Sequence, residues 1–390
     1  MLNFTYCTPT RMIFGQGVIS QLPDQLSKYG HKVLLAYGGG SIKRSGLYDK
    51  VKELLAGFEV HELADIAPNP KYDPSVLDGV KICKTEGIEV ILAVGGGSVL
   101  DCSKAIAASA KYDGDPWDLI TGKVKAQAAL PIIDVMTLAA TGSEYDAACV
   151  ISRTATNDKI GYIDPLLYPR VSFLDPTYTE SVNPKHTAAG VADAINHCME
   201  QFFVSPHNSV ADGYGETLMK TLMLWGPVAL AKPDDYEARA EIMLAAAFAC
   251  NGITNLGAGQ SGWPMHGIEH ALSAFYDITH GEGLAIITPR WMKFILCDRT
   301  VERFVEYGTQ VLGISSELSA YEIANRAIAM TYDFFRDTMH MPMTLREVGI
   351  DGSRLDEIAK HIADNEGLDN PNNFYPLTEA DIRQILQDCL

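Results

Sequence analysis

The chain changes its hydrophobic pattern once, and this change constrains the fold more than any other feature. Up to about residue 180, amphipathic helical stretches alternate with short strand-like runs, at 32–37, 58–63, 89–94 and 131–136. Such alternation predicts a parallel sheet covered by helices. After residue 176 the strand-like runs stop, and helical patterns continue to the end. We therefore expect an α/β N-terminal domain over residues 1–180 and an all-helical C-terminal domain over 181–390.

Composition narrows the class of protein. At 390 residues the chain exceeds one ordinary core, which favours two domains. The formal net charge of −18 argues against nucleic acid or an anionic membrane as a partner, since both are polyanions. The sequence has no uninterrupted apolar run of membrane-spanning length and no secretory pattern at its start. Its eight cysteines form no C-x-x-C pair, so we expect free thiols and a cytoplasmic location.

Two glycine runs follow apolar strand-like segments directly. Gly38, Gly39, Gly40 and Ser41 follow the first, and Gly95, Gly96, Gly97 and Ser98 follow the third. Glycines between a strand and a helix expose backbone N–H groups, which bind phosphate at the positive end of the helix. The spacing differs from the dinucleotide fingerprint G-x-G-x-x-G, so we do not predict an ordinary Rossmann fold. The alternatives are a plain tight turn and, for Ser98 with Asp101, a helix-capping pair.

A third loop follows the fourth strand-like run. It contains Thr137, Thr141 and Ser143, and therefore offers hydroxyl groups beside a glycine turn. Ligands of open parallel sheets bind beyond the carboxyl ends of the strands, where all three loops should lie. We expect them to form one dinucleotide site, with a plain polar loop as the alternative for the third.

Two further segments predict a metal site built from two helices. Asp193 and His197 are four residues apart, as are His266 and His270, and His280 follows ten residues later. Residues i and i+4 share one face of a helix, so Asp193 with His197 can hold one side of a cation and His266 with His280 the other. Imidazole and carboxylate ligands suit Zn²⁺ or Fe²⁺. The alternative is a set of ordinary buried hydrogen bonds.

Taken together, these motifs resemble the iron-dependent (group III) alcohol dehydrogenase family. The similarity rests on Gly95-Gly96-Gly97-Ser98-x-x-Asp101-x-x-Lys104, Thr141-Gly142-Ser143-Glu144, Asp193-x-x-x-His197 and His266-x-x-x-His270-x₉-His280. It covers essentially the whole chain, and it is strongest toward the butanol dehydrogenase and broad aldehyde reductase branch. The resemblance implies a dehydroquinate synthase-like fold and a homodimer, for which residues 4–6 at the sheet edge are a candidate contact.

The resemblance also assigns roles to single residues. It implies Asp193, His197, His266 and His280 as metal ligands, and His270 as a proton relay or nicotinamide contact that does not bind the metal. The implied dinucleotide contacts are Gly38, Gly39, Gly40, Ser41, Gly95, Gly96, Gly97, Ser98, Asp101, Thr137, Thr141, Ser143 and Lys159.

The cofactor preference follows from charge. An acidic residue at the end of the first strand would bind the ribose 2′-OH and repel a 2′-phosphate. The sequence instead has glycines and Ser41 there, followed by Lys43 and Arg44. We therefore predict NADP(H) over NAD(H), with a solvated surface pair as the alternative for the two cations.

A dinucleotide loop together with a divalent metal site indicates hydride transfer with the metal as Lewis acid. Apolar residues near the predicted ligands, such as Trp263, favour a small aliphatic aldehyde or primary alcohol as substrate. One alternative is a lyase of the dehydroquinate synthase type, whose charged substrate needs basic residues that the metal segments lack. The other is a non-catalytic NADP(H)-binding module.

Overall fold

The computed structural model describes all 390 residues, and they form two compact units. The α/β unit comprises Cys7–Val182 and Pro233–Ala247. The helical unit comprises Met1–Tyr6, Asn183–Lys232 and Phe248–Leu390. The main division falls after Val182. A single division at residue 180 would put residues 1–6 in the α/β unit and residues 233–247 in the helical unit, but the structure has residues 1–6 in the helical unit and 233–247 in the α/β unit.

A six-stranded parallel sheet is the centre of the α/β unit, with strand order β1-β8-β5-β4-β2-β3. The expected parallel α/β fold is confirmed. The strands of the sheet are β1 (Arg11–Phe14), β2 (Lys32–Gly38), β3 (Glu59–Ile66), β4 (Val90–Gly95), β5 (Ile132–Met136) and β8 (Val171–Leu174). The apolar runs correctly predicted β2, β3, β4 and β5. They missed β1 and β8, which are four residues each, and the antiparallel pair β6 (Ala148–Arg153) and β7 (Asp158–Ile163).

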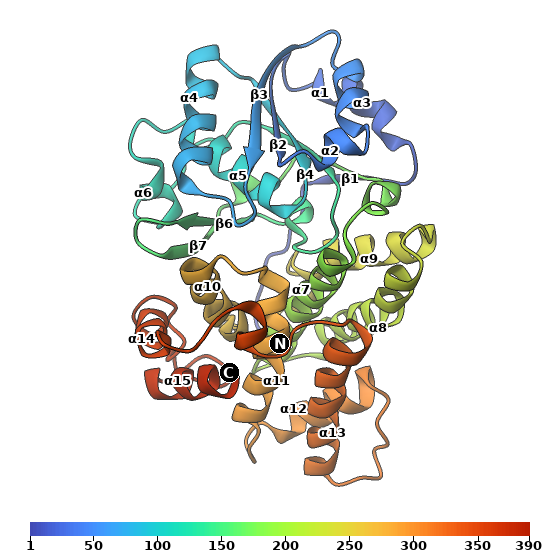
Figure 1. The fold of residues 1–390 in the computed structure, drawn as a ribbon, viewed down its shortest axis with the longest axis vertical. Helices are drawn as coiled ribbons and strands as arrows, with labels where there is room; N and C mark the ends of the chain where they lie inside the picture. Colours follow the sequence, from blue (N-terminus) through green and yellow to red (C-terminus); the bar gives the residue numbers. More distant parts are fainter. The chain divides into compact units, whose positions relative to one another are not determined.

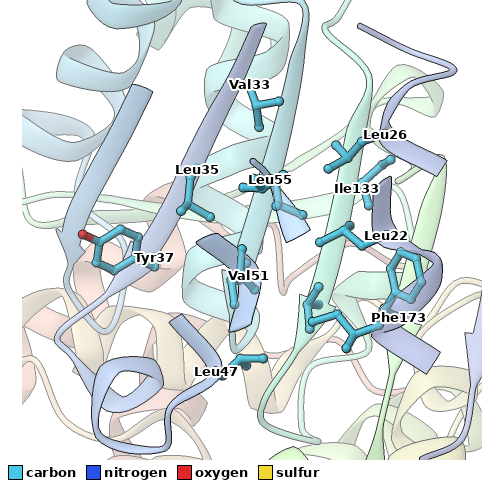
Figure 2. Close-up of a cluster of buried hydrophobic side chains, with 14 of the residues drawn as sticks. Leu22, Leu26, Val33, Leu35, Tyr37, Leu47, Val51, Leu55, Ile133 and Phe173 are labelled. Carbon is cyan, nitrogen blue, oxygen red and sulfur yellow. The ribbon is translucent and has the colours of Figure 1, made fainter. Parts of the chain in front are cut away.

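One face of the sheet carries an apolar core (Figure 2). Successive side chains of a strand point to opposite faces, so Val33, Leu35 and Tyr37 of β2 share this face with Ile133 and Phe173. Two helices cover them, α1 (Leu22–Leu26) and α3 (Leu47–Leu54), which Figure 1 shows on the same side of the sheet. The central strands β4 and β5 are buried on both faces, as their near-continuous apolar runs indicate.

The opposite face packs against α4 (Leu77–Glu86) and α5 (Gly97–Ser109) (Figure 1). The same alternation places Asp134 of β5 and its register partner Ser172 of β8 on this second face. Both are fully buried, and the Ser172 hydroxyl donates to Asp134 Oδ2 at 2.6 Å. Burial raises the pKa of Asp134 well above its usual range. The α/β unit also contains the short helices α2 (Ser41–Arg44) and α6 (Pro116–Ile120).

The helical unit contains the expected long helices and no strand. They are α7 (Pro184–Phe202), α8 (Ser209–Ala231), α10 (Pro264–Tyr276), α11 (His280–Ile295), α12 (Val301–Glu306), α13 (Ala320–Asp333), α14 (Leu355–Asn365) and α15 (Glu379–Asp388), while α9 (Tyr236–Ala249) lies mostly in the α/β unit. None of the helices combines the length and the apolar composition that crossing a bilayer requires.

Candidate metal centre and dinucleotide site

Three helices of the helical unit, rather than the two we expected, contribute the predicted metal ligands. Asp193 and His197 lie on α7, and His266 lies on α10. His280 is the first residue of a separate helix, α11, because Asp277 adopts a left-handed conformation that ends α10. The two-helix prediction was therefore wrong, since it treated His266 and His280 as neighbours on one element.

The ligand atoms converge on the carboxylate of Asp193. Its Oδ1 lies 3.3 Å from His197 Nε2, 3.6 Å from His266 Nε2 and 3.5 Å from His280 Nε2. Four ligands arranged as a tetrahedron around Zn²⁺, with bonds of about 2.1 Å, lie about 3.4 Å from one another. The spacings around Asp193 therefore suit one divalent cation.

The cluster is not symmetric. Asp193, His266 and His280 each bring one ligand atom within 4.8 Å of the other two. His197 approaches Asp193 closely but lies outside this group of three. Its ring stacks on His266 at a centroid distance of 4.9 Å. The structure thus brings all four predicted ligands into one neighbourhood, three of them more tightly than the fourth.

Buried polar atoms without partners support the metal interpretation. Asp193 Oδ1 and His266 Nε2 are both buried, and neither has a hydrogen-bond partner. Buried polar groups are normally paired, so two such atoms that face each other indicate a missing ligand. A divalent cation accepts lone pairs from both, and the N/O donor set is the one that Zn²⁺ and Fe²⁺ prefer.

The pKa values of the cluster show how strongly its groups interact. Burial favours the neutral form of Asp193, but the three imidazoles outweigh it and hold the pKa of the carboxyl below its usual range. Burial lowers the pKa of His197 to about 3. At His266 burial acts the same way, but the carboxylates of Asp193 and Glu200 outweigh it and raise the pKa to about 9.

His270 and Trp263 lie beside this cluster. His270 is on the same helix as His266, and its ring centroid is 5.5 Å from that of His280. Trp263 precedes α10 in a left-handed conformation, with its ring edge-on to His266 at 5.1 Å. Both positions suit groups that contact a substrate at the metal. Phe275, another aromatic residue of α10, packs against Arg354 and His361 of the same unit.

The predicted dinucleotide loops lie at the carboxyl ends of their strands. β2 ends at Gly38 and leads through Gly39 and Gly40 into α2, which begins at Ser41. β4 ends at Gly95 and leads through Gly96 into α5, which begins at Gly97. Thr137 follows β5, and its N–H donates to Gly95 O at 2.9 Å. A Cβ on Gly97 would lie 2.5 Å from Thr141 Oγ1, so only glycine lets the second and third loops meet here.

Asp101 does not cap α5, and its contact with the dinucleotide stays a prediction. It lies one turn inside α5, where its Oδ1 accepts from the Ser143 hydroxyl and its Oδ2 from the Val150 N–H. The capping interpretation was wrong, because Gly96 is the N-cap and no side chain caps the helix. With both oxygens used inside the protein, Asp101 holds the Ser143 turn against α5.

Lys104, the last residue of the Gly95–Lys104 motif, also holds the turn at residues 143–148 against α5. Its fully buried ammonium donates to Ser143 O, Asp146 Oδ1 and Ala148 O at 2.7 to 2.8 Å. Burial opposes the charge, but the carboxylates of Asp146 and Asp101 keep the pKa of Lys104 above its ordinary value. Lys159, a predicted cofactor contact, is buried on β7 opposite Ser152, and its contact with the dinucleotide stays a prediction.

Sequence reasoning missed two glutamates that contact the ligand histidines. Glu200 lies on α7 three residues after His197, and Glu269 lies on α10 three residues after His266. Both are fully buried. The i and i+3 spacing puts each glutamate on the same helix face as a predicted ligand, but it does not indicate which histidine of another helix the glutamate contacts.

Gly281→Ala tests how closely the helices must approach. A Cβ at Gly281 would overlap the backbone carbonyl of Ala189, so the substitution pushes the start of α11, with His280, away from α7. We expect a loss of about 1–3 kcal/mol in the free energy of unfolding, measured by urea denaturation, together with weaker metal binding. The control is Gly213→Ala in α8, which meets nothing within 4 Å and should stabilise by about 0.5–1 kcal/mol. Equal stability of the two variants would contradict the close-approach argument.

Lys104→Met tests the buried cation. The substitution keeps the length of the side chain but removes the donor to Asp146 Oδ1 and to the backbone carbonyls of Ser143, Asp146 and Ala148. Breaking one partner of a buried ion pair costs about 3–5 kcal/mol, so urea denaturation should show a loss of that size. The exposed Lys111→Met, just past the end of α5, should change stability by less than about 0.5 kcal/mol. A small effect at Lys104 would show that the loop is held by other contacts.

Comparison with known proteins places this site in a family. The profile of the family described as iron-containing alcohol dehydrogenase matches residues 9–176, and the profile of the C-terminal domain of the Fe-containing alcohol dehydrogenase family matches residues 187–390. The chain is 46% identical to the NADH-dependent butanol dehydrogenase B of Clostridium acetobutylicum over 390 residues, which cover 99% of each protein. It is 38% identical to the NADPH-dependent aldehyde reductase YqhD of Escherichia coli over 370 residues, or 94% of each protein.

The fold has close counterparts among solved structures. The crystal structure of NADH-dependent butanol dehydrogenase A from Thermotoga maritima superposes with a TM-score of 0.94 at 35% sequence identity. The match covers 100% of this chain and 99% of the other. The predicted combination of a parallel α/β domain and a helical domain is thereby confirmed.

Proposed function

The chain belongs to the iron-containing alcohol dehydrogenase family, and we propose that it transfers hydride between NADP(H) and a small aliphatic aldehyde or primary alcohol. Its class is that of an NAD(P)-dependent alcohol dehydrogenase or aldehyde reductase. The observation that carries the proposal is the convergence of three imidazole Nε2 atoms on the buried, unpartnered Oδ1 of Asp193. The same family membership favours the oxidoreductase over the lyase and the non-catalytic alternatives.

Asp193, His197, His266 and His280 are the residues that would hold the divalent ion, Fe²⁺ or Zn²⁺. When bound, such an ion supplies a Lewis acid that polarises a carbonyl oxygen. The residues of the chain supply position and proton transfer. Trp263 offers an apolar surface edge-on to His266, which suits an uncharged substrate. To the His270 imidazole, which lies beside His280, we assign the transfer of a proton to the alcohol oxygen that forms.

The proposed direction is aldehyde reduction, because NADPH serves cells mainly as a reductant. We also propose a cytoplasmic homodimer. All eight cysteines are free thiols. The suggested dimer contact, residues 4–6, is not a strand in the single chain, and its Phe4 and Tyr6 side chains are 54% and 39% exposed.

Consumption of NADPH with butanal, before and after chelation, tests the reaction. We expect activity in the metal-loaded protein, a fall of at least about 100-fold after chelation, and recovery when Zn²⁺ or Fe²⁺ is added back, because Lewis-acid assistance is worth several kcal/mol. Asp193→Ala should lose activity to a similar extent. His186→Ala, an exposed histidine on the same helix, is the control and should behave as the unmodified protein. Activity that survives chelation and Asp193→Ala would overturn the metal-dependent mechanism.

The preference for NADP(H) rests on the charges that follow β2. Lys43 Nζ lies over the rings of Tyr37 and Tyr48, at 4.9 and 5.0 Å from their centroids, which holds the ammonium near the glycine turn. Of the acids on neighbouring β3, Glu62 accepts hydrogen bonds from both tyrosine hydroxyls and pairs with Lys52. Relatives of both kinds exist, one named NADH-dependent and one NADPH-dependent.

Replacing Lys43 and Arg44 together by alanine tests this preference. A charge-assisted bond to a phosphate is worth about 1.5–3 kcal/mol. The double variant should therefore lose about 10–100-fold in kcat/KM with NADPH and little with NADH. Lys52→Ala is the control, because Lys52 is a neighbouring cation that is paired with Glu62. A higher kcat/KM with NADH than with NADPH in the unmodified protein would refute the proposed preference.

A further inference from the structure

Two buried carboxylates stand directly behind two of the proposed ligand histidines. Imidazole has two ring nitrogens, and the one that does not bind a metal must carry a proton and find an acceptor. In this structure the acceptors for His266 and His280 are Glu200 and Glu269, whose side chains are 1% and 0% exposed. Neither glutamate belongs to the four proposed ligands, so their burial needs a separate explanation.

Glu200 holds His266 in two ways. Its Oε1 accepts from the His266 backbone N–H at 2.9 Å and lies 3.2 Å from the ring Nδ1. The backbone bond fixes the start of α10 relative to α7, and the ring contact fixes the rotation of the imidazole. His266 Nε2 is consequently left facing Asp193 Oδ1 at 3.6 Å.

Glu269 holds His280 by a matching contact. Its Oε2 bonds the His280 Nδ1, and its Oε1 accepts from the Ser273 hydroxyl one turn later on α10. The space for this carboxylate comes from Gly283, since a Cβ there would lie 2.7 Å from Glu269 Cγ. His280 Nε2 is again left facing Asp193 Oδ1, at 3.5 Å.

The two contacts connect the three helices in order, α7 to α10 and α10 to α11. A carboxylate of α7 holds a histidine of α10, and a carboxylate of α10 holds a histidine of α11. His197 is the exception, because its Nδ1 is buried without a hydrogen-bond partner. The two histidines with carboxylate partners are also the two whose ligand atoms lie within 4.8 Å of each other and of Asp193.

We propose that Glu200 and Glu269 are positioning residues of the metal centre, which orient His266 and His280 and make their Nε2 atoms stronger donors. The inference rests on the proposed metal-dependent function and adds to it the groups that set metal affinity. A carboxylate behind a ligand histidine selects the tautomer and increases its basicity, and removal of such a partner typically weakens metal binding 10–100-fold. Two helix-to-helix bonds of this kind hold most of the ligand set in place before the ion arrives.

Glu200→Gln and Glu269→Gln test the proposal, because each keeps the shape of the side chain and removes its charge. The matched control is Glu282→Gln on α11, whose side chain is 8% exposed and pairs with Lys185 at 3.0 Å rather than with an imidazole. Affinity for Zn²⁺ is measured on the purified full-length protein by competition with a chromophoric chelator. We expect each of the two variants to bind about 10–100-fold more weakly than the unmodified protein, and the control to change by less than about 3-fold.

A second readout separates orientation from general loss of structure. Co²⁺ replaces Zn²⁺ in such sites, and its visible absorption reports the geometry and strength of the ligands. The Glu200 and Glu269 variants should shift and weaken these bands, while Glu282→Gln should leave them in place. Should Glu269→Gln not fold, Ser273→Ala removes only the hydroxyl that holds Glu269, and it should weaken Zn²⁺ binding several-fold.

The outcomes are distinguishable. Unchanged Zn²⁺ affinity and Co²⁺ bands in both glutamine variants, or changes no larger than those of Glu282→Gln, would overturn the positioning role while leaving the metal-dependent function intact. Failure of the unmodified protein to bind either ion would instead refute the metal centre on which the proposed function depends.

Discussion

The structure of the helical unit depends on a carboxylate that is buried among imidazoles. Asp193 is only 3% exposed, and three histidine rings surround its Oδ1 at 3.3 to 3.6 Å. A buried charge is tolerated only when it is paired. The two glutamates behind the rings add further negative charge to the same small volume. A divalent cation would neutralise much of this charge and use the lone pairs that no hydrogen bond satisfies, and this is the physical basis of the proposed metal centre.

The helices reach this point only because small residues let them approach one another. At Gly281 the start of α11 lies against the backbone of Ala189, and at Gly283 it makes room for Glu269. Thr288 then donates to the Asn196 side chain, which connects the two helices again beyond the cluster. The arrangement of the proposed ligands thus depends on how closely the helix backbones approach, which glycine allows at Gly281 and Gly283.

The α/β unit also contains a buried charge that is paired, the ammonium of Lys104 with the carboxylate of Asp146. Lys104 and Asp101, one turn apart on α5, hold the turn at residues 143–148 against the helix that begins at the glycine run. Gly97 allows Thr141 to lie directly on that run. The second and third of the predicted dinucleotide loops are therefore held together by direct contacts. Asp101 and Lys104 provide the hydrogen bonds among these contacts, although the motif that contains them suggests contacts with the cofactor itself.

The sequence by itself determined the class of fold and the identity of the candidate ligands. Near-continuous apolar runs identify β2, β4 and β5, because strands buried on both faces carry little polar alternation. The spacing of Asp193 and His197 follows from helical periodicity. Only the tertiary structure decided which helix contributes His280, that Asp101 faces Ser143, and that Glu200 and Glu269 stand behind the ligand rings. The physical reason is that periodicity reports which residues share a face of one element. Contacts such as that of Glu200 with His266, 66 residues apart, depend on how separate elements pack, and a single sequence contains no local signal for that packing.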